Sequence, residues 1–223
     1  MIEGIQLKVC GLRTAADAQA AARVGADYLG FNFYPASPRA ITREHYRSLA
    51  AQLPANPKVA VTVEPSPEDL AALLGAGFSA FQIHFRTELA EAHLAAWAAS
   101  VGPERLWLAP KLPPGEEVAP AWLPYARTWL LDTFQPGAFG GSGRVGDWDK
   151  FRRHLRAHPG SAWILAGGLN AENVGAALRA SGATFVDANS GVESAPGVKD
   201  PAKLNAFAAS VRAERLRAPA AGA

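Results

Sequence analysis

Eight short apolar runs, spread over 223 residues, constrain the fold of this chain more than any other feature. Each run is continuously apolar, whereas a strand with one wet face would alternate apolar and polar residues. Continuous runs are typical of strands that are buried on both faces, as in parallel sheets covered by helices. The runs span residues 7–10, 28–33, 59–63, 80–84, 106–110, 128–132, 162–166 and 184–187.

Helix signals occupy most of the gaps between these runs. Thr14 can cap an alanine-rich segment, and residues 66–69, Ser-Pro-Glu-Asp, combine a capping hydroxyl, a first-turn proline and acids that offset the helix dipole. Asn170 and Asp200 start later segments in the same way. A strand followed by a helix, repeated eight times in a length near ~250 residues, predicts a parallel eight-stranded (β/α)8 TIM barrel.

We expect one domain over residues 1–223, because 49% hydrophobic composition can fill one large core and no linker divides the chain. The structural alternative is an open doubly wound sheet, which would need fewer strands. The fifth repeat is the weakest, since prolines and a glycine crowd residues 112–124 and any helix there is short or irregular. A frayed end is expected over residues 215–223.

Composition points to a small-molecule partner. The 22 basic and 20 acidic residues nearly cancel, and no basic run suggests a nucleic-acid surface. Cys10 is the single cysteine, which excludes an internal disulfide and fits a reducing compartment. No secretion signal and no run near the ~20 apolar residues of a membrane span are visible, so we expect a cytoplasmic protein. The sequence leaves monomer and homodimer open.

Two glycine turns after the last two runs predict a phosphate site. Gly167 and Gly168 follow the seventh run, and Ser190 and Gly191 follow the eighth. Glycines let backbone approach a ligand closely, and amides at turns and helix starts attract anions. Single glycines often serve only a tight turn. Two paired turns after consecutive late strands, where many barrels bind phosphate, favour binding.

Five motifs occur in register along residues 7–212. They are Lys8-Val-Cys10-Gly11-Leu, Gly30 to Arg39, Leu130-Leu-Asp132 with Gly140-Gly-Ser-Gly143, Leu165-Ala-Gly167-Gly168-Leu and Ser190 to Asp200. Together they resemble the motifs of phosphoribosylanthranilate isomerase, an enzyme of tryptophan biosynthesis. The resemblance implies a TIM barrel that converts N-(5-phosphoribosyl)anthranilate to its ketose by an Amadori rearrangement, without metal or organic cofactor.

By this resemblance Cys10 is the general base and Asp132 the general acid. Such a rearrangement needs an acid for the ring oxygen and a base for the C2 proton. Lys8 lies on the same strand face as Cys10, roughly 7 Å away along the chain, and is a candidate for stabilising the thiolate. Alternatively, Lys8 pairs with Asp187 of the neighbouring eighth strand as a structural ion pair. The other readings are a buried apolar Cys10 and a turn-capping Asp132.

The resemblance also assigns substrate-binding residues. Arg39 falls where the family has an arginine that meets the anthranilate carboxylate, which a guanidinium can bind through two parallel hydrogen bonds. Gln82 and His84 match a family pattern, although core hydrogen bonding explains them equally well. The fit loosens after His84, where Phe85 replaces a glycine and Arg86 adds a cation. Asn189 stands where the family usually has serine.

Two other functions remain open at this point. A related sugar isomerase of histidine biosynthesis performs the same rearrangement, but such barrels have aspartate at the position of Cys10 and a second phosphate site. A phosphate-binding barrel without catalysis would keep the glycine turns and lose the acid and base.

We also expect residues 136–143, which are rich in glycine, to form a mobile flap.

Overall fold

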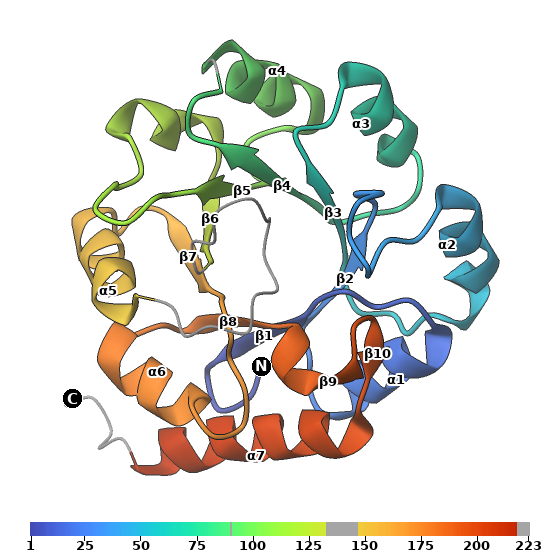
Figure 1. Cartoon of the computed structure of the whole chain (residues 1–223), viewed down its shortest axis with the longest axis vertical. Helices are drawn as coiled ribbons and strands as arrows, with labels where there is room; N and C mark the ends of the chain where they lie inside the picture. Colours follow the sequence, from blue (N-terminus) through green and yellow to red (C-terminus); the bar gives the residue numbers. More distant parts are fainter. Residues whose placement is uncertain (90, 133–146, 218–223) are drawn as a thin grey trace.

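A computed structural model describes residues 1–89, 91–132 and 147–217 and has a closed barrel of eight parallel strands in chain order (Figure 1). Each strand coincides with one of the eight apolar runs, so the predicted fold class is confirmed. The strands are β1 (Gln6–Val9), β2 (Tyr28–Asn32), β3 (Lys58–Val63), β4 (Ala80–Arg86), β5 (Leu106–Lys111), β6 (Thr128–Leu131), β7 (Ala162–Leu165) and β8 (Phe185–Ala188).

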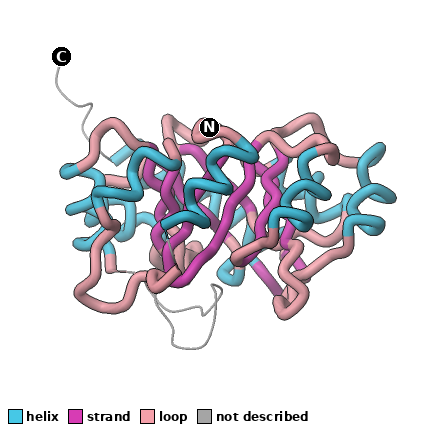
Figure 2. Tube along the Cα trace, turned by 90° about the horizontal axis from the view of Figure 1, so that it is seen from above, coloured by secondary structure: helices cyan, strands magenta, loops and turns pink. Residues whose placement is uncertain are grey.

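The helices lie outside the strands and cover them (Figure 2). The predicted caps at Thr14 and Ser66 form, since their hydroxyls accept hydrogen bonds from the amides of Asp17 and Asp69. Helix α6 begins only at Val174, with Asn173 at its N-cap, later than the start expected at Asn170. After β5 only a 3-10 helix forms, as the prolines there predict. The helices are α1 (Ala15–Arg23), α2 (Arg43–Leu49), α3 (Pro67–Leu74), α4 (Glu91–Val101), α5 (Trp148–Ala157), α6 (Val174–Ser181) and α7 (Pro201–Arg217), with 3-10 helices η1 (Ala50–Gln52), η2 (Pro120–Tyr125) and η3 (Ser190–Val192).

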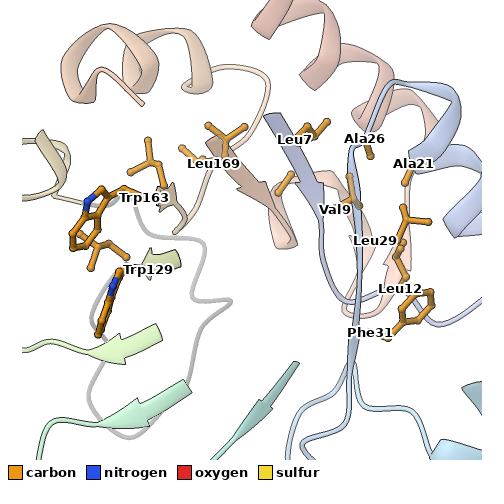
Figure 3. Close-up of a cluster of buried hydrophobic side chains, with 14 of the residues drawn as sticks. Leu7, Val9, Leu12, Ala21, Ala26, Leu29, Phe31, Trp129, Trp163 and Leu169 are labelled. Atoms are coloured by element: carbon orange, nitrogen blue, oxygen red, sulfur yellow. The ribbon is translucent and has the colours of Figure 1, made fainter. Parts of the chain in front are cut away.

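Alternate residues of each strand face two different apolar layers. Leu7 and Val9 of β1 pack outward in the larger cluster between strands and helices, shown in part in Figure 3. Cys10, which follows β1, belongs instead to the inner cluster together with residues of the other strands. Burial on both faces explains why the strands read as continuous apolar runs. It also places Lys8 and Cys10 on the inward side of the barrel wall.

Closure and the late loops build the mouth of the barrel. β1 pairs with β8, with Lys8 opposite Asp187. After η3 the chain forms an antiparallel hairpin, β9 (Glu193–Ala195) and β10 (Val198–Lys199), before α7 begins (Figure 1). The sequence patterns did not predict this hairpin. Residues 215–217 belong to α7, whereas residues 218–223 of the expected frayed end lie outside the described residues, as does the expected flap at 136–143.

The described helices can also be compared with the requirements for crossing a bilayer. None of them combines the length and the apolar composition that a membrane-spanning helix requires.

Candidate active site

A pocket opens at the carboxyl ends of the strands, where the loops of a TIM barrel meet. It brings together every predicted site residue except Gly191, which packs against Leu169 of the lining. Residues of seven strand ends contribute, and the wall is mainly polar on the side of the early strands. The lining residues are Cys10, Asn32, Tyr34, Ser37, Arg39, Val61, Val63, Gln82, His84, Leu130, Asp132, Ala166, Gly167, Gly168, Leu169, Asp187, Asn189 and Ser190.

Cys10 reaches this pocket because its neighbour on β2 is a glycine. A Cβ on Gly30 would lie 3.1 Å from the Cys10 sulfur and 3.0 Å from Cε of Lys8, so a larger residue would crowd both side chains. Cys10 is 4% exposed. Burial raises the pKa of its thiol, and the positive charge of Lys8 offsets this only in part. The thiol is therefore protonated in the resting protein at neutral pH.

Lys8 serves both of the partners that the sequence offers it. Its Nζ donates to Oδ1 of Asp187 at 3.0 Å, and the side chain is fully buried. Burial lowers the pKa of Lys8, but attraction from Asp187 and from Cys10 outweighs it and leaves the pKa raised. Lys8 is thus charged beneath Cys10. The same ammonium group forms the ion pair across the β1–β8 seam and supplies the positive charge beside the thiol.

Asp132 follows the last residue of β6 and enters the pocket from another side. In the closed strand order, β7 and β8 separate β6 from β1, so Asp132 and Cys10 approach from well-separated points of the ring. The carboxylate of Asp132 acts electrostatically on Arg39 and helps to raise the pKa of that guanidinium. Residues 133–146, which follow it, lie outside the described residues.

Gln82 and His84 point into the pocket from β4. Gln82 Nε2 lies 2.7 Å from His84 Nε2, and this pair needs the amide to donate and the imidazole to accept. Burial, helped by the charge of Lys8, lowers the pKa of His84 to about 4, so the ring is neutral at pH 7. The carbonyl oxygen of Gln82 is buried and has no hydrogen-bond partner among the described residues. It remains available to a ligand hydroxyl.

Arg86, the cation that departs from the family pattern, does not enter the pocket lining. Its guanidinium pairs with the carboxylate of Glu64, and its backbone amide also donates to Glu64 Oε1 at 2.7 Å. Glu64 has φ +40°, an uncommon value for a residue other than glycine. These contacts between Arg86 and Glu64 join the ends of β3 and β4. The bulk of Phe85 is accommodated in the outer core, where its side chain is fully buried.

The guanidinium of Arg39 makes two hydrogen bonds to a buried carboxylate. Its Nε and Nη2 donate to the two carboxylate oxygens of Glu193 at 2.9 and 2.7 Å. Lys199 donates to the same carboxylate at 2.8 Å. Sequence reasoning singled out the motif containing Glu193 and Lys199 without giving either residue a function. Two charged residues around a proline-glycine turn, directly after a predicted phosphate loop, were the available signal.

The two glycine turns lie against each other. Gly167 and Gly168 have φ of 93° and 61°, the region that side chains disfavour, and their amides donate no hydrogen bond to another described residue. A Cβ on Gly191 would lie only 2.0 Å from the carbonyl oxygen of Leu169, so the second turn packs on the first without room for a methyl group. Backbone amides without a partner at such a turn can bind an anion.

Fold and pocket define a class of protein. A parallel eight-stranded barrel with its polar pocket at the strand ends, and with adjoining glycine turns after β7 and β8, is a TIM-barrel enzyme for small phosphorylated molecules. Fold and phosphate site alone do not name a reaction.

Comparison with known proteins gives the family. Residues 7–210 match the family model described as N-(5'phosphoribosyl)anthranilate (PRA) isomerase. The N-(5'-phosphoribosyl)anthranilate isomerase of Zymomonas mobilis is 35% identical, over 93% of this chain and 98% of its own. The chain belongs to the phosphoribosylanthranilate isomerase family, as its motifs predict.

Solved structures agree with this membership. The phosphoribosyl anthranilate isomerase of Thermus thermophilus is 31% identical and has a TM-score of 0.78, over 94% of this chain and 99% of its own. A second isomerase, solved in complex with reduced 1-(o-carboxyphenylamino)-1-deoxyribulose 5-phosphate, is 28% identical, with a TM-score of 0.72 and the same coverage.

Proposed function

We propose that Cys10 and Asp132 are the base and the acid with which this isomerase of tryptophan biosynthesis converts N-(5'-phosphoribosyl)anthranilate to 1-(2-carboxyphenylamino)-1-deoxyribulose 5-phosphate. The observation that carries the proposal is the joint placement of these two groups. They line one pocket, from well-separated strands, together with the glycine turns that can hold a phosphate. A sugar bound by its phosphate against β7 and β8 would present its C1 and C2 between them.

The reaction moves one proton in at the acid and one proton out at the base. Protonated Asp132 donates to the ring oxygen as the C1–O bond breaks and the lone pair of the anthranilate nitrogen, which keeps its proton, forms an iminium ion with C1. The thiolate of Cys10 then removes the proton from C2, the electron pair of that C–H bond forms a C1–C2 double bond, and the C–N double-bond pair returns to the nitrogen as a neutral amine. The resulting enol tautomerises to the ketone, and no oxidant or reductant is consumed.

The two groups must share a single proton at the start of this sequence. Because burial raises the pKa of the thiol, the active tautomer, with a thiolate and a protonated carboxyl, is unfavourable to form without help. Lys8 favours this tautomer by stabilising the thiolate. The ion pair with Asp187 keeps the Lys8 cation in place.

The remaining polar residues have separate tasks. Arg39 meets the anthranilate carboxylate. The neutral ring of His84 and the free carbonyl oxygen of Gln82 offer hydrogen bonds to ribose hydroxyls without adding charge near Lys8. The phosphate is held by the amides of Gly167 and Gly168 and by the turn at Ser190 and Gly191. A base that must remain a free thiol also fits a reducing, cytoplasmic setting.

Loss of substrate fluorescence, which arises from the anthranilate group, tests the proposal. Cys10→Ala and Asp132→Asn should each lose about 10² to 10⁴ in turnover, as expected for removal of a general acid or base, while binding the product normally. The exposed pair of Asp149 with Arg152 supplies the control, and Asp149→Asn should leave turnover unchanged. A variant at Cys10 or Asp132 with wild-type turnover would remove that residue from the mechanism.

The same assay separates this function from the alternatives. A phosphate-binding barrel without catalysis would leave the fluorescence of the substrate unchanged even with the unaltered protein. The histidine-pathway isomerase is not supported, because cysteine occupies the base position and the chain belongs to the anthranilate family.

A further inference from the structure

Two charged residues of the β9–β10 hairpin are buried although the hairpin lies outside the barrel. Glu193 is 6% exposed and Lys199 is 4% exposed, and the two face each other in the hairpin register. A buried charge is strongly unfavourable unless it is paired and hydrogen-bonded. A hairpin that served only to join β8 to α7 would not need either charge, so the pair calls for an explanation outside the hairpin.

The carboxylate of Glu193 and the ammonium of Lys199 each have several hydrogen-bond partners. Besides Arg39 and Lys199, the carboxylate of Glu193 accepts from the amide of Gly197 at 3.2 Å. Lys199 Nζ donates to that carboxylate and to the backbone and side-chain oxygens of Asn189, at 2.8, 3.2 and 3.1 Å. Burial and the neighbouring charge of Arg39 lower the pKa of Lys199, and the attraction of Glu193 opposes them only in part. Burial raises the pKa of Glu193, but Arg39 and Lys199 outweigh it and leave the pKa lowered, so this carboxylate stays ionised.

The hairpin is itself fixed to the rest of the fold. Lys203 in the first turn of α7 donates to the carbonyl oxygen of Glu193 at 2.6 Å. The stem of Arg39 packs closely on Gly11, where a Cβ would lie 2.7 Å from Arg39 Cδ. Gly11 also has φ +73°, so glycine is required there on two grounds. Arg39 is thus held at its stem by the residue after Cys10 and at its tip by the hairpin.

This arrangement leaves one part of the guanidinium for a ligand. Glu193 occupies Nε and Nη2, whereas Nη1 makes no hydrogen bond within the described residues and Arg39 lines the pocket. Arg39 and Lys199 are cations, and Glu193 is an anion. These three groups together carry one excess positive charge, and Arg39 presents it to the pocket, where Asp132 also acts on it.

We propose that Glu193 and Lys199 are positioning residues that fix the orientation of Arg39 and thereby select a substrate bearing a carboxylate. The inference rests on the proposed function, since it assumes that Arg39 meets the anthranilate carboxylate. Glu193 acts by aligning the guanidinium before the substrate arrives, which lowers the entropy lost on binding. Lys199 acts by balancing Glu193, so that the excess charge of Arg39 remains for the ligand.

Two ligands separate positioning from general structural support. Reduced 1-(o-carboxyphenylamino)-1-deoxyribulose 5-phosphate carries the carboxylate, whereas ribose 5-phosphate lacks it and shares the sugar phosphate. Glu193→Gln should weaken binding of the first ligand about 10- to 100-fold, comparable with the loss of one well-aligned charged hydrogen bond. Binding of ribose 5-phosphate should change less than about twofold. The matched control is Glu104→Gln, which alters an exposed ion pair with Arg127 and should change neither affinity.

A double-mutant cycle with Arg39→Met completes the test. If Glu193 acts through Arg39, Glu193→Gln adds no further loss of affinity in the Arg39→Met background. Additive losses, or equal weakening of both ligands, would overturn the inference. Glu193→Asp keeps the buried charge but shortens its reach, so it repeats the comparison should Glu193→Gln fail to fold. Failure of the unaltered protein to bind the carboxylate ligand more tightly than ribose 5-phosphate would overturn the proposed function instead.

Discussion

Replacing Gly191 by alanine tests whether the contact between the two glycine turns builds the phosphate site. The added Cβ would lie 2.0 Å from the carbonyl oxygen of Leu169 and 2.8 Å from its carbonyl carbon. Side chains essentially never approach to within 3.0 Å in this way, so the turns must separate by at least about 1 Å. The obstacle is backbone, which cannot swing aside as a flexible side chain would. No left-handed φ contributes, so the effect comes from the contact alone.

The size of the effect follows from what moves. Overpacking of this kind destabilises by about 1–3 kcal/mol. A shift of about 1 Å also misaligns amides that must converge on one phosphate, and loss of one charged hydrogen bond corresponds to about 1.5–3 kcal/mol. We therefore expect Gly191→Ala to weaken binding of ribose 5-phosphate about 10- to 100-fold. The melting temperature should fall as well.

The assay is competition by ribose 5-phosphate against turnover, with thermal melting measured in parallel. Gly160→Ala is the matched control, because nothing lies within 4 Å of a Cβ at that position and its backbone does not require glycine. It should leave both affinity and melting unchanged. If Gly191→Ala bound ribose 5-phosphate as the unaltered protein does, the two turns would not form a shared phosphate site.

Three further predictions concern the groups around the ribose. Arg39→Lys should raise KM about tenfold or more with a smaller change in kcat, because lysine cannot form two parallel hydrogen bonds; an unchanged KM would contradict carboxylate recognition. His84→Gln should retain turnover within about tenfold. The pH profile of turnover by the unaltered enzyme should show no His84 inflection near pH 6.5, because His84 with a pKa of about 4 is neutral throughout that range. The value of kcat/KM should persist to alkaline pH and fall only as Cys10 titrates. That fall should lie above the ordinary thiol pKa of about 8.5, because burial raises the pKa of Cys10. A fall beginning below pH 8 would contradict a raised thiol pKa.

The barrel could be predicted because each strand carries its own evidence. Burial on both faces made the runs at 59–63 and 106–110 continuously apolar, and the caps at Thr14 and Ser66 marked helix starts locally. The irregular fifth repeat was equally visible, since the prolines that limit it to η2 lie within it. Such features depend on neighbours in the chain and not on the final topology.

The site was predictable only in part. The strand-end rule places Cys10, Asp132 and the glycine turns at one mouth without any knowledge of side-chain contacts. The contact of Arg39 with Glu193 joins residues 154 positions apart and depends on the hairpin after β8. No local pattern encodes that pairing. For the same reason the sequence did not decide between Cys10 and Asp187 as the partner of Lys8. Only closure of the barrel between β1 and β8 brings Asp187 beside Lys8.

The arrangement of base and acid around the sugar can be seen most directly in a crystal structure with reduced 1-(o-carboxyphenylamino)-1-deoxyribulose 5-phosphate bound. We expect the sulfur of Cys10 within about 4 Å of C2, the carboxylate of Asp132 within hydrogen-bond distance, about 3 Å, of the oxygen that leaves C1 on ring opening, and the phosphate at the turns after β7 and β8. A complex in which Cys10 and Asp132 both point away from the bound carbons would contradict the mechanism.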